Sequence, residues 1–416
     1  MKFTDFNFSE SLLEGIAAIG FEDATPVQEQ AIPVILSGQD MIASAQTGTG
    51  KTAAFLLPVI EKIHTSPPQD SVKALVIVPT RELAMQIDQH MQGLSYFTPV
   101  SSIPVYGGTD GITFDLEKKS LMEGADVVIC TPGRMIAHLN QGYVKLNDLR
   151  FLILDEADRM LDMGFHDDIM RIIAYLPKDR QTLMFSATMP DKIRQLARKV
   201  LKSPVEINIA VSKPAERVLQ VAYVLYESQK IPLAVNLLGA NRLRSVLVFC
   251  STKSSTKSLS RDLKRAGLMV EEIHSDLDQN EREKVLLAFK NKSLNILVAT
   301  DILSRGIDVE DIDLVLNYDV PHDGEDYIHR IGRTARAASE GMAITFISEK
   351  EQDKFRRIEK LLGQAVYKAA LPPELGEGPA YSESSGRNGR SSRSQSGFNR
   401  KSRKTSDKSR GKDYRK

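Results

Sequence analysis

The stretch Phe151-Leu152-Ile153-Leu154-Asp155-Glu156-Ala157-Asp158 decides the fold class of this chain. Its four leading apolar residues predict a buried strand, and the acids that follow lie where the strand leaves the core. Carboxylates in that position can hold Mg²⁺ beside a nucleotide. The stretch therefore predicts an α/β sheet that binds its ligand at the carboxyl ends of the strands.

A second stretch upstream, Ala45-Gln46-Thr47-Gly48-Thr49-Gly50-Lys51-Thr52, has the glycines and the terminal Lys-Thr of a phosphate-binding turn. Backbone amides and a helix N-terminus there favour phosphate, Lys51 is expected to reach the β- and γ-phosphates, and Thr52 to help hold Mg²⁺. Ala45 stands where the general pattern has its first glycine. The two stretches together predict a nucleoside triphosphatase.

The rest of the chain repeats this organisation twice. Short apolar runs alternate with helical patterns, which is typical of parallel sheets covered by helices on both faces. The expected strands are 73–78, 126–130, 151–154 and 181–185 in the first half, and 245–250, 270–274, 296–299, 314–318 and 342–347 in the second. We predict a first domain over 1–208, a linker over 209–217, a second domain over 218–370 and a disordered tail over 371–416. The second series has no Gly-Lys-Thr turn, so one nucleotide is expected.

Length and composition agree with this division. A chain of 416 residues with 42% apolar residues is long enough for two hydrophobic cores. Cys130 and Cys250 end apolar runs in different halves, which indicates reduced core thiols. There is no apolar leader and no run long enough to span a membrane, so we expect a cytoplasmic protein with no membrane partner.

Charge is concentrated in the tail. Residues 382–416 contain twelve Lys or Arg against three acids, a net charge of +9, and since the whole chain carries +1, residues 1–381 sum to −8. Basic residues interleaved with Ser and Gly favour a salt-sensitive tether to nucleic acid, with a merely solvating tail as the alternative.

These motifs, with Thr25-Pro26-Val27-Gln28 after Gly20-Phe21, resemble the DEAD-box family of ATP-dependent RNA helicases. The resemblance covers about residues 1–370 and implies two tandem RecA-like domains. It implies that Gln28 reads the adenine, which makes ATP the fuel, and that an aromatic residue upstream completes this motif. Phe3 is the simplest candidate for that aromatic residue, and Phe6 is its rival.

The resemblance also implies catalytic roles in both halves. Asp155 is expected to hold Mg²⁺ and Glu156 to orient and deprotonate the attacking water. In His329-Arg330-Ile331-Gly332-Arg333-Thr334-Ala335-Arg336, the side chains of Arg333 and Arg336 are expected to act as arginine fingers. Ser186 and Thr188 are expected to couple nucleotide state to closure, and Asp308 to contact the ribose.

Several loops that follow strands offer amides, hydroxyls and single arginines, which suit the sugar-phosphate backbone and not base edges. The resemblance implies that single-stranded RNA is bound without sequence preference, with RNA favoured over DNA through 2′-hydroxyl contacts. The expected contacts are Arg81, Gly107, Gly108, Thr131, Pro132, Gly133, Arg134, Thr252, Gln279, Arg282 and Thr300.

Two other functions remain open from the sequence. One is a DNA helicase or translocase on the same motor, and the other is an RNA clamp that binds ATP without hydrolysing it. Within the family, Ala43-Ser44-Ala45-Gln46 and the short basic tail look most like the bacterial RhlE-like group. We expect a monomer, with ribosomal or mRNA-decay assemblies as plausible partners.

Overall fold

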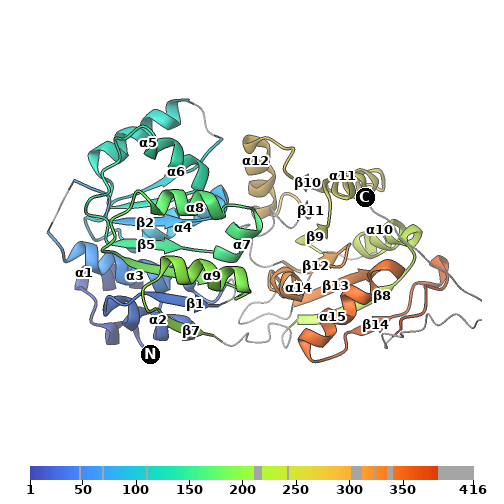
Figure 1. Cartoon of the computed structure of the whole chain (residues 1–416). Coiled ribbons are helices and arrows are strands. Elements are labelled where there is room, and N and C mark those ends of the chain that lie inside the picture. Colours follow the sequence, from blue (N-terminus) through green and yellow to red (C-terminus); the bar gives the residue numbers. More distant parts are fainter. Residues whose placement is uncertain are drawn as a thin grey trace, which may run out of the picture. The chain divides into compact units, whose positions relative to one another are not determined.

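The computed structural model describes residues 1–45, 48–67, 70–108, 111–209, 218–240, 243–300, 312–322, 324–334 and 341–382. The described chain forms two seven-stranded sheets, and every strand pairing within them is parallel (Figure 1). The strands of the first sheet are β1 Met41–Ser44, β2 Ala74–Ile77, β3 Ser102–Val105, β4 Val127–Cys130, β5 Phe151–Leu154, β6 Gln181–Ser186 and β7 Val205–Asn208. Those of the second are β8 Val218–Val224, β9 Val246–Cys250, β10 Val270–Ile273, β11 Ile296–Thr300, β12 Leu314–Asn317, β13 Gly341–Ile347 and β14 Tyr367–Ala369.

Helices connect these strands. In the first half they are η1 Phe3–Phe6, α1 Glu10–Ala18, α2 Pro26–Leu36, α3 Lys51–His64, α4 Arg81–Leu94, α5 Gly111–Glu123, α6 Pro132–Leu139, α7 Ala157–Asp162, α8 His166–Ile173 and α9 Asp191–Val200. In the second they are η3 Glu227–Gln229, α10 Lys230–Ala240, α11 Lys253–Arg265, α12 Gln279–Lys290, α14 Gly324–Ile331, η4 Glu349–Glu351, α15 Gln352–Leu362 and η5 Pro373–Leu375.

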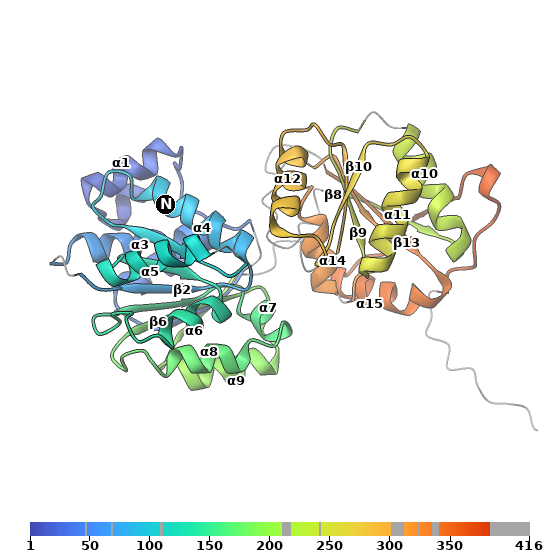
Figure 2. The ribbon, with the colours of Figure 1, turned by 90° about the horizontal axis from the view of Figure 1, so that it is seen from above.

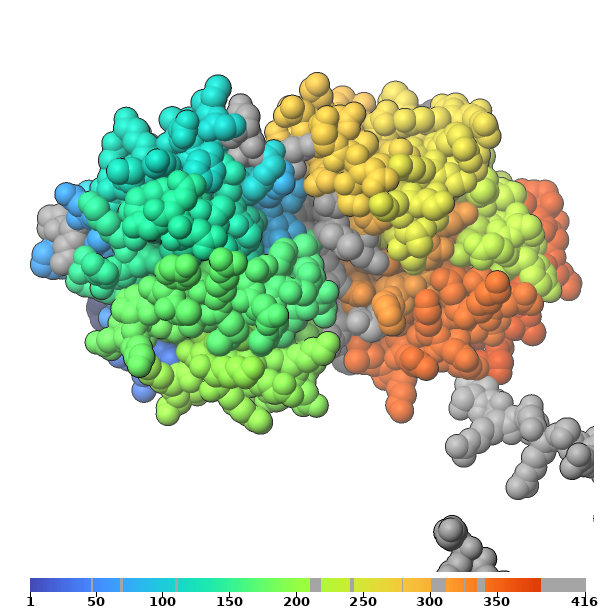
Figure 3. Space-filling model, turned by 45° about the horizontal axis from the view of Figure 1, so that its top comes forward, coloured from blue at the N-terminus to red at the C-terminus, as the bar shows by residue number. Residues whose placement is uncertain are grey.

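The first sheet has the strand order β3-β4-β2-β5-β6-β1-β7 and a core on each face. Alternate residues of each strand point to opposite faces, so Ile153 belongs to the core under α1 to α4 and Leu154 to the core under α5 to α9. Figure 2 shows α1, α3 and α4 on one side of the sheet and α6, α8 and α9 on the other, and Figure 3 shows the outer surface of α5 to α9 in cyan and green. Because the sheet is parallel, the carboxyl ends of its strands meet at one edge.

The second sheet repeats this plan with the order β10-β11-β9-β12-β13-β8-β14. Helices α10 and α11 cover one face, while α12, α14 and α15 lie on the other (Figure 2). The α/β fold class with two RecA-like domains is thus confirmed. The strands expected from apolar runs match β2, β4, β5, β6 and β9 to β13 within two residues at either end.

Five strands were missed by the sequence analysis: β1, β3, β7, β8 and β14. Edge strands β3, β7 and β14 have partly exposed residues and no unbroken apolar run, so local pattern alone does not reveal them. Of the predicted linker, only Ile209 lies within the described residues.

The second half does not end at residue 370, where the sequence analysis placed the start of the disordered tail. Leu371 and Leu375 pack against the core under α10, and the Tyr381 hydroxyl donates to Glu359 Oε2 at 2.6 Å. The compact unit extends to Tyr381. These contacts explain the correction, because three apolar or aromatic side chains spaced through a polar segment are enough to dock it. Residues 383–416 lie outside the described part of the chain.

Cys130 and Cys250 are free and buried, as expected. Burial raises the pKa of both thiols, so they stay protonated. Among the helices that the structure describes, none has the length and apolar character needed to cross a membrane.

Candidate active site and nucleic-acid surface

The Gly-rich turn lies at the carboxyl edge of the first sheet, between β1 and α3. The amide of Ala45 donates to Ser186 O at 3.1 Å, which ties the start of the turn to the neighbouring strand β6. Gly48 and Gly50 have φ angles of +81° and +90°. Those left-handed conformations are available to glycine at little cost, so both glycines are required by the backbone. Gln46 and Thr47 lie outside the described residues.

Lys51 is the first residue of α3, and Thr52 follows it in the first turn. Only 7% of Lys51 is exposed, although no ion pair holds its ammonium group within the part of the chain that the structure describes. A helix N-terminus preceded by left-handed glycines attracts an anion through its free amides and its dipole. A buried ammonium group beside such a terminus is suited to a phosphate.

Gln28 is connected to this turn. Its Oε1 accepts the amide of Thr25 at 2.8 Å in a capping box of α2, and its Nε2 donates to Gly50 O at 3.1 Å. A Cβ on Gly50 would lie 2.6 Å from Gln28 Nε2, so glycine is needed there for space as well as for φ. The adenine-reading role remains a prediction, and in this structure both ends of the amide are already hydrogen bonded.

The aromatic residues near Gln28 form one cluster. Phe3 and Phe6 are 4% and 6% exposed, and their ring centroids lie 6.1 Å apart. Phe21 stacks on Phe3 at 6.1 Å and is 38% exposed. Both candidates for the upstream aromatic residue are therefore buried, and Phe21 presents the accessible ring.

Asp155 and Glu156 leave the end of β5 as predicted. Asp155 is 3% exposed, and burial raises its pKa to about 6 even though Lys51 lies near enough to oppose the shift. Its charged form therefore lacks full compensation in the protein alone. Glu156 adopts a left-handed conformation, with φ 50° and ψ 48°, as the residue before α7. Such a conformation is uncommon in a non-glycine residue.

Asp158 links this acidic motif to β6. Its Oδ2 accepts the amides of Ala187 and Thr188 at 3.1 and 3.0 Å, and Ser186 Oγ donates to Thr188 O at 2.7 Å. The predicted coupling residues Ser186 and Thr188 are thus held beside the acidic motif by hydrogen bonds.

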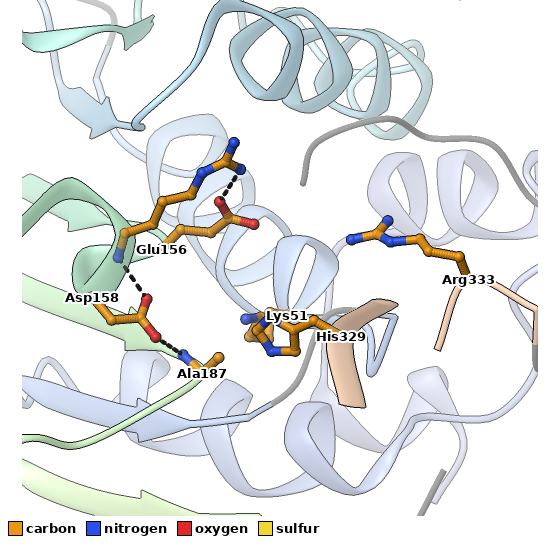
Figure 4. A pocket seen from close by; sticks show the side chains of 7 residues that line it. Lys51, Glu156, Asp158, Ala187, His329 and Arg333 are labelled. Carbon is orange, nitrogen blue, oxygen red and sulfur yellow. Dashed lines mark hydrogen bonds and ion pairs between the residues drawn. The ribbon is translucent and has the colours of Figure 1, made fainter. Parts of the chain in front are cut away.

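A pocket collects groups from these segments and from the second half (Figure 4). It is lined by Lys51, Glu156, Asp158, Arg159, Ala187, His329 and Arg333. Of the predicted catalytic set, the pocket brings together Lys51, Glu156 and Arg333. Arg336 and Asp308 fall outside the described residues.

Four lining residues received no individual role from the sequence analysis: Asp158, Arg159, Ala187 and His329. Arg159 forms an ion pair with Glu156, with Nη1 3.0 Å from Oε2. The signal available in the sequence was the spacing of three residues, which places both side chains on one face of a helix. That spacing is too common on helix surfaces to indicate a site without the burial that the structure adds.

Two predicted RNA-binding segments of the first half lie together. The guanidinium group of Arg81, the first residue of α4, lies against Gly108, where a Cβ would collide with it. Gly108 also has a φ of +81°. The absence of a side chain at Gly108 therefore gives Arg81 its position, and Gly107 adjoins the same contact.

The third segment begins at Thr131, Pro132 and Gly133, which start α6. Arg134 turns inward there. Its Nε donates to Glu117 Oε2 at 2.6 Å, its guanidinium group lies 4.5 Å from the ring centre of Phe114, and its side chain is 13% exposed. Hydrogen bonding to RNA by Arg134 remains a prediction, and the structure gives it contacts that join α5 to α6.

In the second half, Thr252 caps α11 by accepting the amide of Ser255 at 3.1 Å, and it is exposed. Arg282 donates from Nε to Leu277 O and from Nη2 to Ser275 O, both at 3.1 Å, and so braces the loop before α12. Thr300 ends β11 and is 8% exposed. The side chain of Gln279 is outside what the structure describes.

A phosphate-binding turn, an acidic motif on the next strand but one, and an arginine in the same pocket define a nucleotide-hydrolysing motor with two RecA-like halves. Residues 25–196 match the family model described as DEAD/DEAH box helicase, and residues 229–338 match the helicase conserved C-terminal domain. The chain belongs to the DEAD-box family of ATP-dependent RNA helicases.

Curated relatives agree with this assignment. The chain is 44% identical to the ATP-dependent RNA helicase CshA of Listeria monocytogenes over 360 residues, which cover 86% of this chain and 68% of that protein. It is 40% identical to the DEAD-box ATP-dependent RNA helicase CshA of Bacillus subtilis, over 86% and 72% of the two chains. The expected likeness to the RhlE-like group is not borne out by these relatives, which are named CshA.

Solved structures show the same fold. S. cerevisiae Dbp5 bound to RNA and ADP BeF3 superposes with a TM-score of 0.79 at 31% identity, over 88% of this chain and 95% of that one. Mss116p bound to single-stranded RNA and AMP-PNP gives a TM-score of 0.79 at 30% identity, over 90% and 80%.

Proposed function

We propose that this chain is an ATP-dependent RNA helicase that couples ATP binding and hydrolysis to closure of its two halves on single-stranded RNA. Closure in turn unwinds short duplexes or remodels RNA-protein complexes. The observation that supports this most strongly is the pocket, because it contains Lys51 and Glu156 of the first half together with Arg333 of the second.

The chemistry follows from the character of these groups. Lys51, with the amides of the Gly-rich turn, binds the β- and γ-phosphates of ATP, and Gln28 and Phe21 bind the adenine. Glu156 accepts a hydrogen from the attacking water and orients it toward the γ-phosphorus atom. Arg333 offsets the negative charge that grows on the transferring phosphoryl group.

The residues present fit a magnesium ion. Burial raises the pKa of the Asp155 carboxylate, so a cation beside it would stabilise the charged form. Thr52, the residue after Lys51 in the first turn of α3, supplies a hydroxyl oxygen. Both are hard oxygen ligands, which Mg²⁺ prefers. Asp155 and Thr52 would hold the ion, which would supply positive charge to offset that of the phosphates.

The RNA surface proposed here consists of hydroxyls, amides and braced arginines. Arg81 with Gly108, the start of α6 and the exposed Thr252 suit the sugar-phosphate backbone. RNA-bound structures of similar proteins support RNA as the partner. We infer a monomeric, cytoplasmic enzyme with a basic tail that tethers RNA, and with ribosomal or mRNA-decay assemblies as its setting.

The test is steady-state ATP hydrolysis by the full chain with no nucleic acid, with single-stranded RNA and with DNA of the same sequence. Strong stimulation by RNA alone is expected, together with unwinding of a short RNA duplex. Equal stimulation by DNA would favour a DNA translocase instead. ATP and RNA binding with no hydrolysis under any condition would favour a clamp.

The matched variant is Glu156→Gln, which keeps the size of the side chain and removes its charge. Loss of a positioned base should lower turnover by about 10²–10⁴-fold while ATP and RNA still bind. Turnover by this variant at the rate of the natural chain would remove Glu156 from the mechanism.

A further inference from the structure

The pocket contains an ion pair between Glu156 and Arg159, and the proposed mechanism gives no role to Arg159. Arg159 Nη1 donates to Glu156 Oε2 at 3.0 Å, and the two side chains are 5% and 13% exposed. Figure 4 shows Glu156 with one carboxylate oxygen at the dashed line of this ion pair, while its second oxygen points away from that line. A pair so buried differs in kind from a surface salt bridge, because each partner loses most of its hydration and depends on the other.

Local backbone geometry creates the pair. Glu156 has left-handed φ and ψ angles and directly precedes α7, while Arg159 lies in the first turn of that helix. Residues three apart on a helix face the same side. The backbone thus places the Glu156 side chain at the pocket, and the fixed fork of the guanidinium group then selects which way the carboxylate turns.

The electrostatic surroundings of Glu156 give Arg159 a particular place among the cations. Arg159, Lys51 and Arg333 line the same pocket as Glu156. Arg159 is hydrogen bonded to the Glu156 carboxylate, and both side chains are buried. Lys51 and Arg333 bind phosphate during turnover in the proposed mechanism. Arg159 is therefore the cation that stays paired with Glu156.

We propose that Arg159 is a positioning residue for ATP hydrolysis: it holds Oε2 of Glu156, so that Oε1 faces the pocket and accepts a hydrogen from the attacking water. The inference rests on the proposed function. Arg159 does not touch the reacting atoms in this account and acts only through Glu156. The alternative is a purely structural pair that neutralises a buried acid without affecting the chemical step.

These two roles differ in kinetics. A displacement of about 1 Å in a positioned group can cost about 10²-fold in rate while binding is unchanged. We therefore expect Arg159→Met to lower kcat for RNA-stimulated hydrolysis by about 10–100-fold, with KM for ATP changed by less than about threefold. Arg159→Lys keeps a cation but not the fork, and should recover part of the loss, to within about tenfold of the natural kcat.

The control is Arg198→Met on the exposed side of α9, which removes a guanidinium group of the same size away from the pocket. It should leave both constants unchanged. A double-variant cycle completes the test, since in the Glu156→Gln background Arg159→Met should cause little further loss. Effects that simply add would show that Arg159 does not act through Glu156.

Each outcome is decisive. If Arg159→Met has the same kcat as the natural chain, the inference is overturned and the proposed function is left intact. A natural chain that hydrolyses no ATP would overturn both. If Arg159→Met does not fold, Arg159→Lys carries the test, and a natural kcat in that variant with a weakened KM would assign Arg159 to ATP binding instead.

Discussion

The two halves of this chain have the same strand order, yet a lysine at the start of a corresponding helix has different partners in each half. Each strand of the first sheet has a counterpart in the second, with β8 matching β1 and β12 matching β5. The helix that follows the first of these strands begins at Lys51 in one half and at Lys230 in the other. The first acid after the second strand is Asp155 in one half, directly after β5, and Asp319 in the other, two residues after β12. Each half thus has a lysine at the start of this helix and an aspartate close after this strand.

In the second half these two residues bind each other. Lys230 Nζ lies 2.9 Å from Asp319 Oδ1 and 3.3 Å from both Glu351 Oε2 and Glu227 Oε1, with 2% of its side chain exposed. Burial alone would lower the pKa of Lys230, but the carboxylates around it raise the pKa overall. Asp319 Oδ2 also accepts the amide of Ser251 at 2.8 Å.

In the first half the corresponding groups stay apart. Within the described part of the chain no ion pair joins Lys51 to Asp155, and the left-handed glycines before Lys51 leave amides for an anion. In this chain, the half that has the phosphate-binding turn keeps its lysine and aspartate out of an ion pair with each other. In the other half the lysine is neutralised by carboxylates of the same half.

The largest effect should come from exchanging the two lysines for methionine. Lys51→Met should lower ATP hydrolysis by about 10²–10³-fold with little loss of stability, because a phosphate contact is removed. Lys230→Met should leave the KM for ATP unchanged. It should destabilise the second half by about 3–5 kcal/mol, because it leaves buried carboxylates without their cation.

Hydrolysis kinetics and urea unfolding of both variants measure this contrast. If Lys230→Met impaired ATP hydrolysis as strongly as Lys51→Met does, the ion pairs of Lys230 would belong to the nucleotide site and the comparison would fail.

The docked segment after residue 370 should have the next largest effect. Gln229, beside Lys230, donates to Leu375 O at 2.8 Å, so this segment supports the start of α10. Ending the chain at Ala370 should cost about 2–4 kcal/mol through lost apolar burial and hydrogen bonds. Ending it at Ser382 should cost almost nothing. Equal unfolding temperatures of the two shortened chains would show that residues 371–382 contribute nothing to the stability of the second half.

The smallest effect concerns Asp155 and its pKa, which is raised from 3.8 to about 6. The folded chain without ligand therefore binds this proton more tightly than the unfolded chain does. The stability from this source is fully present below the ordinary pKa and is lost as pH rises through about 6. Asp155→Asn should then be more stable at pH 7.5 by about 1–2 kcal/mol, and inactive.

Thermal unfolding between pH 4.5 and 7.5 measures this, with the difference between variant and natural chain growing as pH rises. Asp319→Asn is the matched control, and it should lose stability because Lys230 then loses the charge of its nearest carboxylate. A pH-independent difference for Asp155→Asn would contradict the assignment of a strained carboxylate at the nucleotide site.

Part of the site could be predicted because its residues adjoin strands with strong apolar runs. The acidic motif follows β5, whose limits were predicted without error, and the Gly-rich turn has a composition that few other structures need. Arg159 and the inward turn of Arg134 could not be predicted, since each depends on a buried partner. Glu117, the partner of Arg134, is seventeen residues away on another helix.

The sequence by itself determined that the chain has two parallel α/β halves, a single phosphate-binding turn and an acidic motif to work with it. These features depend on periodicity and on residues close together in the chain. Only the tertiary structure showed that Lys230, at the start of the corresponding helix of the second half, is neutralised by buried carboxylates. Glu351 reaches Lys230 from 121 residues away, and strand order, not local pattern, brings such groups together.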